Sequence, residues 1–111
     1  MEIKHTKNGQ VHLVELEGRL DALNNAKAES FFNQLSDDAD LNILVDCEKL
    51  DFINSSGLRI LIMSLKKLKK SDKLLILCNL QKNIEEVFQF SGFDNLFKIF
   101  GSKQEALNAL S

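Results

Sequence analysis

The sequence contains no proline, only two cysteines and no long apolar run. Without proline or a low-complexity stretch we expect no linker, so residues 1–111 should form a single domain. Cys47 and Cys78 match neither a disulfide framework nor the spacing of metal ligands, and we expect both to be small buried thiols in a reducing compartment. The first residues lack the apolar core of a signal peptide, and no run reaches the roughly 18 residues of a membrane span. We therefore expect a cytoplasmic protein with no membrane partner.

A large excess of either charge is also missing. The 14 basic and 16 acidic side chains leave a net charge of −2, so no overall basic field exists to attract nucleic acid. Apolar residues make up 44% and charged residues 27%, proportions typical of a folded globular domain. We therefore expect a globular protein that does not bind nucleic acid directly.

The common motifs of catalysis and nucleotide binding are absent as well. There is no Gly-x-Ser-x-Gly elbow for a serine nucleophile, and both histidines lie in the opening hairpin described below. There is no Gly-x-x-x-x-Gly-Lys or Gly-x-Gly-x-x-Gly loop to hold phosphates. Asp21, Asp46 and Asp51, near the ends of predicted strands, are expected to cap turns. We expect no enzyme activity and no cofactor.

The chain begins with the pattern of a β-hairpin. Asn8-Gly9 separates two strand-like runs, and both residues tolerate the positive φ of a two-residue type I′ turn. This turn would pair Lys7 with Gln10 and hence place His5 directly opposite His12. Because two histidines alone make a weak metal site, we expect a surface pair and no bound metal.

Helix and strand patterns alternate after the hairpin. Apolar residues at helical spacing or in short continuous runs mark these segments. In order they are a helix at 24–36, an acidic loop at 36–40, a central strand at 43–45, a helix with an apolar stripe over 58–68, a strand at 74–78, a short helix ended by Ser91-Gly92, an edge strand at 96–100 and a closing helix capped by Ser102 and Glu105. The expected class is α/β, with a mainly parallel mixed sheet of about five strands and about four helices.

Residues 50–58 join a strand to the longest of these helices. In such sheets, sites form where strand C-terminal ends meet helix N-termini, and Ser55 and Ser56 lie at one of these junctions. A helix N-terminus carries partial positive charge and tolerates an added phosphate. A helical wheel places Ile60 and Met63 near Ser56 and almost opposite the main apolar stripe. These two side chains would form an exposed contact surface, unless a neighbouring helix or loop covers them.

This junction also resembles a known family. Residues 52–58, Phe-Ile-Asn-Ser-Ser-Gly-Leu, resemble the Asp-Ser-Ser-Gly-Leu signature of STAS domains, specifically the bacterial anti-sigma factor antagonists. Residues 16–21 resemble the family's Gly-x-Leu-Asp segment, and residues 87–97 resemble its late helix and turn. The sequence departs from the signature at Asn54, where the family usually has aspartate. The resemblance implies the STAS fold, an N-terminal β-hairpin followed by alternating helices and strands.

The resemblance further implies a phosphorylation-switched regulatory protein that takes part in partner switching. In the family, the first serine of the signature is phosphorylated by a partner that is both anti-sigma factor and serine kinase, and a PP2C-type phosphatase removes the phosphate. By position this role falls on Ser55, with Ser56 as the second choice. A different hypothesis is a STAS ligand-binding or scaffold module that recognises a small anion or nucleotide at the same helix start. The residues expected to bind the partner are Asp21, Asn54, Ser55, Ser56, Gly57, Ile60 and Met63.

Overall fold

The computed structural model describes residues 1–38 and 40–110. Helices and strands alternate in the order that the sequence predicts. In chain order the elements are β1 (Glu2–Asn8), β2 (Val11–Leu20), α1 (Asn25–Asp38), β3 (Asn42–Ile53), α2 (Ser55–Lys69), β4 (Leu75–Cys78), α3 (Lys82–Ser91), a short 3-10 helix (Phe93–Asn95), β5 (Lys98–Phe100) and α4 (Lys103–Leu110).

The five strands form one mixed sheet in the spatial order β1-β2-β3-β4-β5. β1 pairs antiparallel with β2, whereas all other neighbours are parallel. Parallel neighbours need long crossover connections, which explains why a helix follows each of β2, β3 and β4. Ile43, Leu44 and Val45 of the central strand are completely buried. The predicted class and the central place of this run are confirmed.

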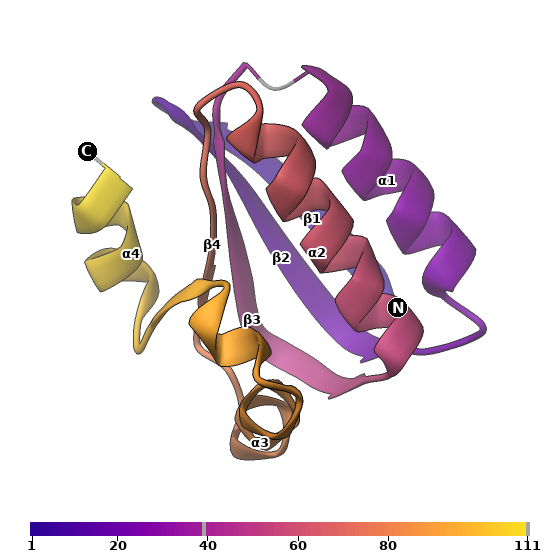
Figure 1. Ribbon diagram of the computed structural model, residues 1–111. Helices are drawn as coiled ribbons and strands as arrows, with labels where there is room; N and C mark the ends of the chain where they lie inside the picture. Colours follow the sequence, from indigo (N-terminus) through magenta and orange to yellow (C-terminus); the bar gives the residue numbers. More distant parts are fainter. Residues whose placement is uncertain (39, 111) are drawn as a thin grey trace.

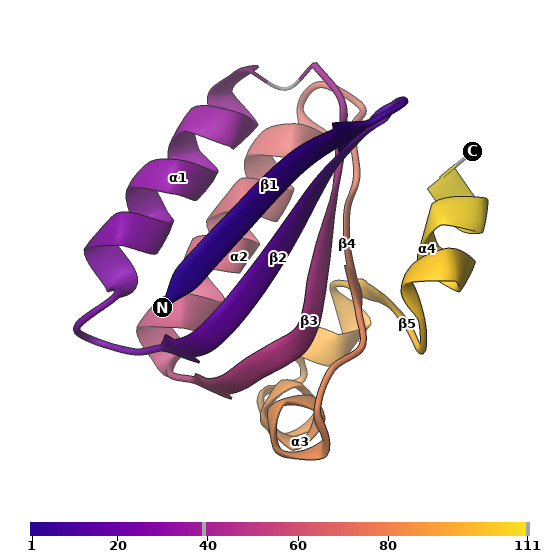
Figure 2. The same cartoon turned by 180° about the vertical axis from the view of Figure 1, so that it is seen from behind.

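Helices cover the two faces of the sheet unequally. α1 and α2 lie side by side over one face, and α3 lies at one end of the sheet (Figure 1). This face supplies the larger apolar core, which includes Leu16, Val45 and Leu77. On the opposite face a smaller cluster forms around Ala106, where α4 packs against β3, β4 and β5. Among the described residues, no helix lies over the outer face of β1 (Figure 2).

The opening hairpin forms, but the predicted register is wrong. Its turn lies one residue later, at Gly9-Gln10, so that His5 pairs with Val14 and not with His12. Residues 11–14 are all buried, and β2 therefore has no apolar and polar alternation there to fix the register. The error moves each partner by two positions, which keeps side chains on the same face and leaves the two histidines diagonal neighbours. His5 is exposed as predicted, but His12 is buried.

Strand β3 is much longer than the run at 43–45 predicted. β4 ends at Cys78, which pairs with Asp46, and beyond this point β3 has only β2 as a strand neighbour. Glu48, Lys49 and Asp51 in this part of the strand are exposed. A strand that runs along an edge tolerates such polar residues, which is why its sequence lacks a continuous apolar run. We refer to residues 47–53 as the β3 extension.

Other predicted boundaries hold, with two corrections. The edge strand predicted at 96–100 begins only at Lys98, because residues 93–95 form a 3-10 helix and residues 96–97 a turn and a bend. α1 continues through Asp38, so residues 36–38 of the predicted acidic loop are helical, and Ala39 lies outside the described residues. Gly92 ends α3 with a left-handed φ of 78°. The Ser102 hydroxyl accepts a hydrogen bond from the Glu105 N–H at 3.1 Å, as the predicted cap requires. None of the helices in the described ranges is long and apolar enough to cross a membrane.

Candidate modification and partner-binding site

The start of α2 is fixed by Asn54, which caps the helix. Its backbone is extended, at φ −102° and ψ −179°, and its Oδ1 accepts a hydrogen bond from the Gly57 N–H at 2.8 Å. The Asn54 carbonyl accepts from the Leu58 N–H at 3.0 Å, and the Asn54 N–H donates to the Leu20 carbonyl at 3.1 Å. Asparagine is among the preferred residues at this position because its side chain satisfies an otherwise unpaired helix N–H. The capping geometry is thus complete without a carboxylate.

Gly57 lets the first turn of α2 approach the sheet closely. A Cβ at this position would lie 2.7 Å from Leu20 Cγ and 2.9 Å from Ile53 Cγ1. Both neighbours are buried at the ends of β2 and β3, so they have little room to move. Gly57 itself is buried and positions the helix start, and its contact with a partner stays a prediction.

Ser55 and Ser56 project from this fixed turn into solvent. Both are exposed, and neither hydroxyl has a hydrogen-bond partner among residues 1–38 and 40–110. The first turn of α2 contains no acidic residue, so no carboxylate of its own would repel a phosphate there. The hydroxyl is accessible, and the positive end of the helix dipole favours an added negative charge.

Asp21 shapes the β2–α1 loop at the same edge of the sheet. Its carboxylate accepts hydrogen bonds from the Leu23 N–H at 3.2 Å, from Asn24 Nδ2 at 3.1 Å and from Arg19 Nε at 3.3 Å. Partial burial acts to raise the pKa of Asp21, but these three hydrogen bonds together hold it below its usual value. The predicted turn-capping role is confirmed, and the carboxylate acts on its own loop.

Two further features at this edge were not recognised in the sequence. The Arg19 guanidinium lies over the ring of Phe52, 4.2 Å from its centroid, and so links β2 to the β3 extension. Leu23 is 92% exposed, which is unusual for a large apolar side chain. A lone leucine in a polar loop gives no signal in a sequence, because its exposure depends on the fold.

The β3 extension has no β4 partner and is held by two amide side chains at the start of α3. Gln81 Nε2 donates to the Glu48 carbonyl at 2.9 Å, and Asn83 Nδ2 donates to the Asp51 carbonyl at 2.8 Å. These bonds satisfy backbone acceptors that would otherwise depend on water. Gln81 and Asn83 therefore support the segment that leads into Ser55, a role that only the fold reveals.

The predicted exposure of Ile60 and Met63 on α2 is half correct. Met63 is 46% exposed, as expected. Ile60 is only 5% exposed and belongs to the larger core, so its predicted exposure is wrong. α1 packs beside α2 and buries part of the face opposite the main stripe. Lys67 Nζ reaches Asp37 Oδ1 of α1 at 3.0 Å, which shows that the helices meet along this side.

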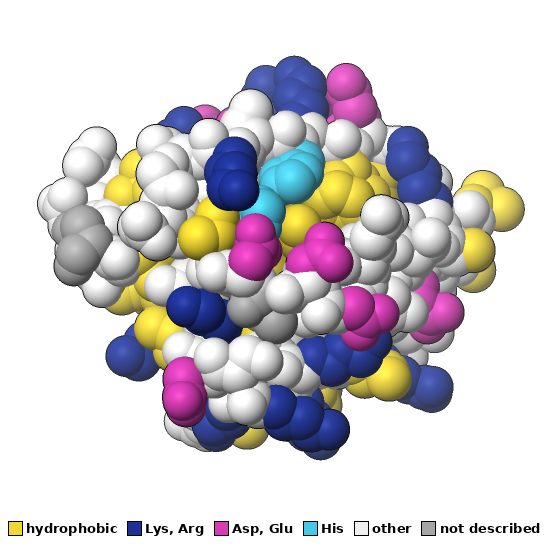
Figure 3. Space-filling view, turned by 90° about the horizontal axis from the view of Figure 1, so that it is seen from above, with side chains coloured by type: hydrophobic (Ala, Val, Ile, Leu, Met, Phe, Trp, Pro, Cys, Tyr) yellow, Lys and Arg dark blue, Asp and Glu magenta, His cyan; other side chains and the backbone are white. Residues whose placement is uncertain are grey.

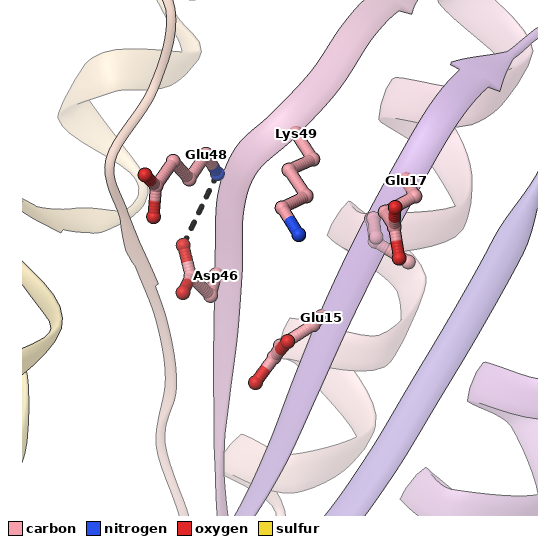
Figure 4. Close-up of a pocket in the computed structure, with 6 residues that line it drawn as sticks. Glu15, Glu17, Asp46, Glu48 and Lys49 are labelled. Atoms are coloured by element: carbon pink, nitrogen blue, oxygen red, sulfur yellow. Dashed lines mark hydrogen bonds between the residues drawn. The ribbon is translucent and has the colours of Figure 1, made fainter.

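A small hollow lies on the outer face of the sheet, away from α1 and α2. It has a volume of about 30 Å³, room for about one water molecule, and Lys49 lies among the carboxylates that line it (Figure 4). The buried Asp46 accepts hydrogen bonds from the Glu48 N–H and from Asn79 Nδ2, each at 3.1 Å, so its carboxylate is already satisfied. No group of three His, Cys, Asp or Glu side chains in the described ranges could hold a metal ion. Three larger hollows lie elsewhere, and Ser55 lines none of the four.

Both cysteines are buried free thiols, as predicted. They lie on different faces of the sheet, since Cys47 belongs to the larger core and Cys78 to the cluster near α4. Burial raises the pKa of Cys47 far above its usual value, and burial with the nearby Asp46 raises the pKa of Cys78 to about 12. Neither thiol is therefore a nucleophile at neutral pH.

Comparison with known proteins gives a consistent assignment. The family model described as the STAS domain matches residues 2–106. The chain belongs to the STAS domain family. BtrV of Bordetella bronchiseptica, a candidate anti-sigma factor antagonist, is 33% identical over an alignment of 90 residues that covers 78% of each chain. The anti-sigma-B factor antagonist of Staphylococcus aureus is 24% identical over 99 residues, covering 89% of this chain and 92% of that protein.

Solved structures agree on the fold. The anti-sigma factor antagonist SpoIIAA in its unphosphorylated form superimposes with a TM-score of 0.82 at 22% identity, over 97% of this chain and 95% of that one. SpoIIAA in its phosphorylated form gives a TM-score of 0.78 at 20% identity, over 99% and 100% of the two chains. The two sequence relatives described above are named anti-sigma factor antagonists, a family of regulatory proteins and not of enzymes.

Proposed function

We propose that this STAS protein is an anti-sigma factor antagonist that binds an anti-sigma factor while Ser55 is unmodified and releases it when Ser55 is phosphorylated. The observation that carries the proposal is the exposed, unbonded Ser55 hydroxyl at the rigidly capped start of α2. The names of its relatives, which are anti-sigma factor antagonists, support an anti-sigma factor as the partner. One of the structural neighbours exists in a phosphorylated form, which supports modification as the switch.

The proposed switch acts through charge. A phosphoryl group adds about −1.5 to −2 charges. Within the molecule, the N-terminal end of α2 stabilises this charge, because helix N–H groups and the helix dipole point toward it. In a closely packed interface the same charge would have to be desolvated and would repel acidic groups of the partner. Phosphorylation should therefore cause release while the fold stays intact.

The proposed interface combines this turn with two exposed apolar side chains. Ser55 and Ser56 provide polar contacts, and Met63 lies two turns further along α2 with almost half of its surface exposed. Leu23 lies in the loop after β2, at the same edge of the sheet as the start of α2 (Figure 1). Adaptable methionine and exposed leucine suit a protein contact, with the fixed serine turn beside them.

The proposed modifying enzymes are the anti-sigma factor itself, acting as a serine kinase, and a PP2C-type phosphatase. Asn54 affects how a kinase would recognise this turn. It provides the helix cap that an aspartate would provide, but without the negative charge beside the modified serine. We therefore propose that the kinase partner of this chain recognises the turn by its shape and its hydroxyl group, without an acidic neighbour.

The test is isothermal titration calorimetry with the anti-sigma factor of the same cell. Ser55→Ala should bind as tightly as the unmodified protein, whereas Ser55→Asp should bind at least tenfold more weakly, since each 1.4 kcal/mol is tenfold in affinity. Ser56→Asp is the matched control, because it places the same charge one residue further along and should weaken binding less. Equal affinities of Ser55→Ala and Ser55→Asp would reject the proposal.

Two further measurements separate this function from ligand binding. Intact-mass spectrometry with site mapping, on protein from its native cell, should find one phosphate and place it on Ser55. A panel of nucleotides and small anions should give no binding heat with unmodified protein. Tight binding of one nucleotide that Ser55→Asp abolishes would instead favour a ligand-binding STAS module.

A further inference from the structure

Two imidazoles and a carboxylate form a continuous chain of hydrogen bonds at the end of the sheet opposite Ser55. His5 Nε2 of β1 lies 2.9 Å from His12 Nδ1 of β2, and His12 Nε2 lies 2.8 Å from Asp40 Oδ1, just before β3. Figure 3 shows the histidine surface beside carboxylate side chains at this end of the molecule. The cluster thus joins β1, β2 and the segment before β3.

The geometry of His12 fixes where the protons are. An ionised Asp40 can only accept, so the His12 Nε2 must carry a hydrogen. In neutral His12 the Nδ1 is then an acceptor, and the His5 Nε2–H donates to it. His12 is 7% exposed, so both of its ring nitrogens depend on these partners and not on bulk water.

This chain of bonds tolerates one added proton but not two. If His5 takes a proton on Nδ1, its Nε2–H still donates to neutral His12. If His12 takes the proton instead, His5 can accept through Nε2. When both rings are protonated, two N–H groups and two positive charges face each other across 2.9 Å, and the contact must open.

Solvent reaches the two histidine rings, and few charged groups lie near enough to balance added positive charge on them. A hollow of about 250 Å³ borders both rings and is lined by Phe31, Gln34, Leu35 and Asp38 of α1. The titratable and charged groups that face the pair are Asp38, Asp40 and Lys7, whose Nζ lies 3.9 Å from Asp40 Oδ2. Partial burial and the neighbouring His12 lower the pKa of His5, while Asp40 acts in the opposite direction.

We propose that His5, His12 and Asp40 form a proton-sensitive clasp that fastens the edge strand β1 and the segment before β3 at neutral pH and opens in mild acid. The direction of the pH effect follows from the linkage between protonation and folding. A histidine that is harder to protonate when folded stabilises the protein above its ordinary pKa of about 6.5, and this contribution is lost as the pH falls below that value. The chain contains only two histidines, so no other imidazole can produce the same response.

The test is amide hydrogen exchange of β1, read by NMR at pH 7.5 and 5.5 and expressed as protection relative to an unfolded chain. In the unmodified protein, protection at residues 4–7 should fall about tenfold at the lower pH, and the melting temperature should fall by roughly 4–8 °C. His5→Gln should remove most of this pH dependence, because a glutamine can turn either its amide N–H or its carbonyl toward His12.

Lys4→Gln is the matched control. It removes a charge from the same strand by breaking the exposed Lys4–Glu17 ion pair at 3.2 Å, and it should leave the pH response of β1 unchanged. Nitrogen shifts of the two rings at pH 8 should report hydrogen on Nε2 of both. Equal loss of β1 protection in the unmodified protein and His5→Gln, or a hydrogen on His12 Nδ1 at pH 8, would overturn the clasp.

Discussion

Two serines on helix α2 lie nine residues apart in opposite environments. Ser55 opens the helix, is exposed, and its hydroxyl has no partner in the described part of the chain. Ser64 lies inside, 1% exposed, and its Oγ also has no hydrogen-bond partner. In water an unpaired hydroxyl loses nothing and remains available to a kinase. In the core the same group is inaccessible and costs stability, because it has given up its hydrogen bonds to water.

The largest effect on this difference between Ser55 and Ser64 is expected from a change in the turn that presents Ser55. Gly57→Ala places a Cβ within 3 Å of Leu20 and Ile53, and we expect a loss of about 1–3 kcal/mol in the free energy of unfolding because both neighbours are buried. Urea denaturation measures it. Gly101→Ala is the control, since its Cβ would meet nothing closer than 3.7 Å. Equal stability of the two variants would mean that the turn is not held against the sheet.

Asn54→Ala should have the next largest effect. It removes the acceptor of the Gly57 N–H and should lower the free energy of unfolding by about 1 kcal/mol. Asn54→Asp retains an acceptor and should be at least as stable as the native protein at pH 7, because negative charge is favoured at a helix start. Thermal denaturation compares the three proteins. If Asn54→Asp were as unstable as Asn54→Ala, the cap would not account for the difference.

Ser64→Ala should stabilise the protein by about 1 kcal/mol, since it removes a buried unpaired hydroxyl. Part of any gain would come from the higher helix propensity of alanine. Ser30→Ala corrects for this part, because Ser30 is exposed in the middle of α1. The difference between the two variants in urea denaturation measures the burial alone, and a difference of zero would show that Ser64 is satisfied in solution.

The smallest effect on stability is expected for Met63→Asp. This side chain is 46% exposed, so its replacement should change the free energy of unfolding by less than about 0.5 kcal/mol. Binding to the anti-sigma factor should nevertheless weaken, because an unpaired charge would enter the proposed interface. Calorimetry and thermal denaturation of the same preparation separate the two effects. Unchanged affinity would remove Met63 from the interface.

The order of helices and strands could be predicted from the sequence because the spacing of apolar residues agrees with the residues that begin and end each helix. The stripe on α2, the left-handed Gly92 and the cap at Ser102 each act within a few residues, so they can be interpreted without the fold. The order of strands and helices then limits the topology to a mainly parallel sheet. The position of Ser55 at a strand-to-helix junction follows from the same local signals.

What could not be predicted depends on contacts between distant segments. Ile60 lies on a second apolar face, and only the packing of α1 beside α2 determines that this residue is buried while Met63 is not. The predicted hairpin register was wrong for a similar reason. β2 is buried on both faces near its start, so either register places apolar groups inside. Gln81 and Asn83 had no sequence signal, because their acceptors lie about thirty residues away.

The two buried thiols have a practical consequence for following the proposed switch. Since Cys47 and Cys78 are inaccessible and their pKa values are raised, maleimide reagents at neutral pH should leave the folded native chain unlabelled. A single Ser56→Cys substitution would then give one reactive site, next to Ser55, without removal of either native cysteine. A fluorophore attached there would report partner docking and release in real time.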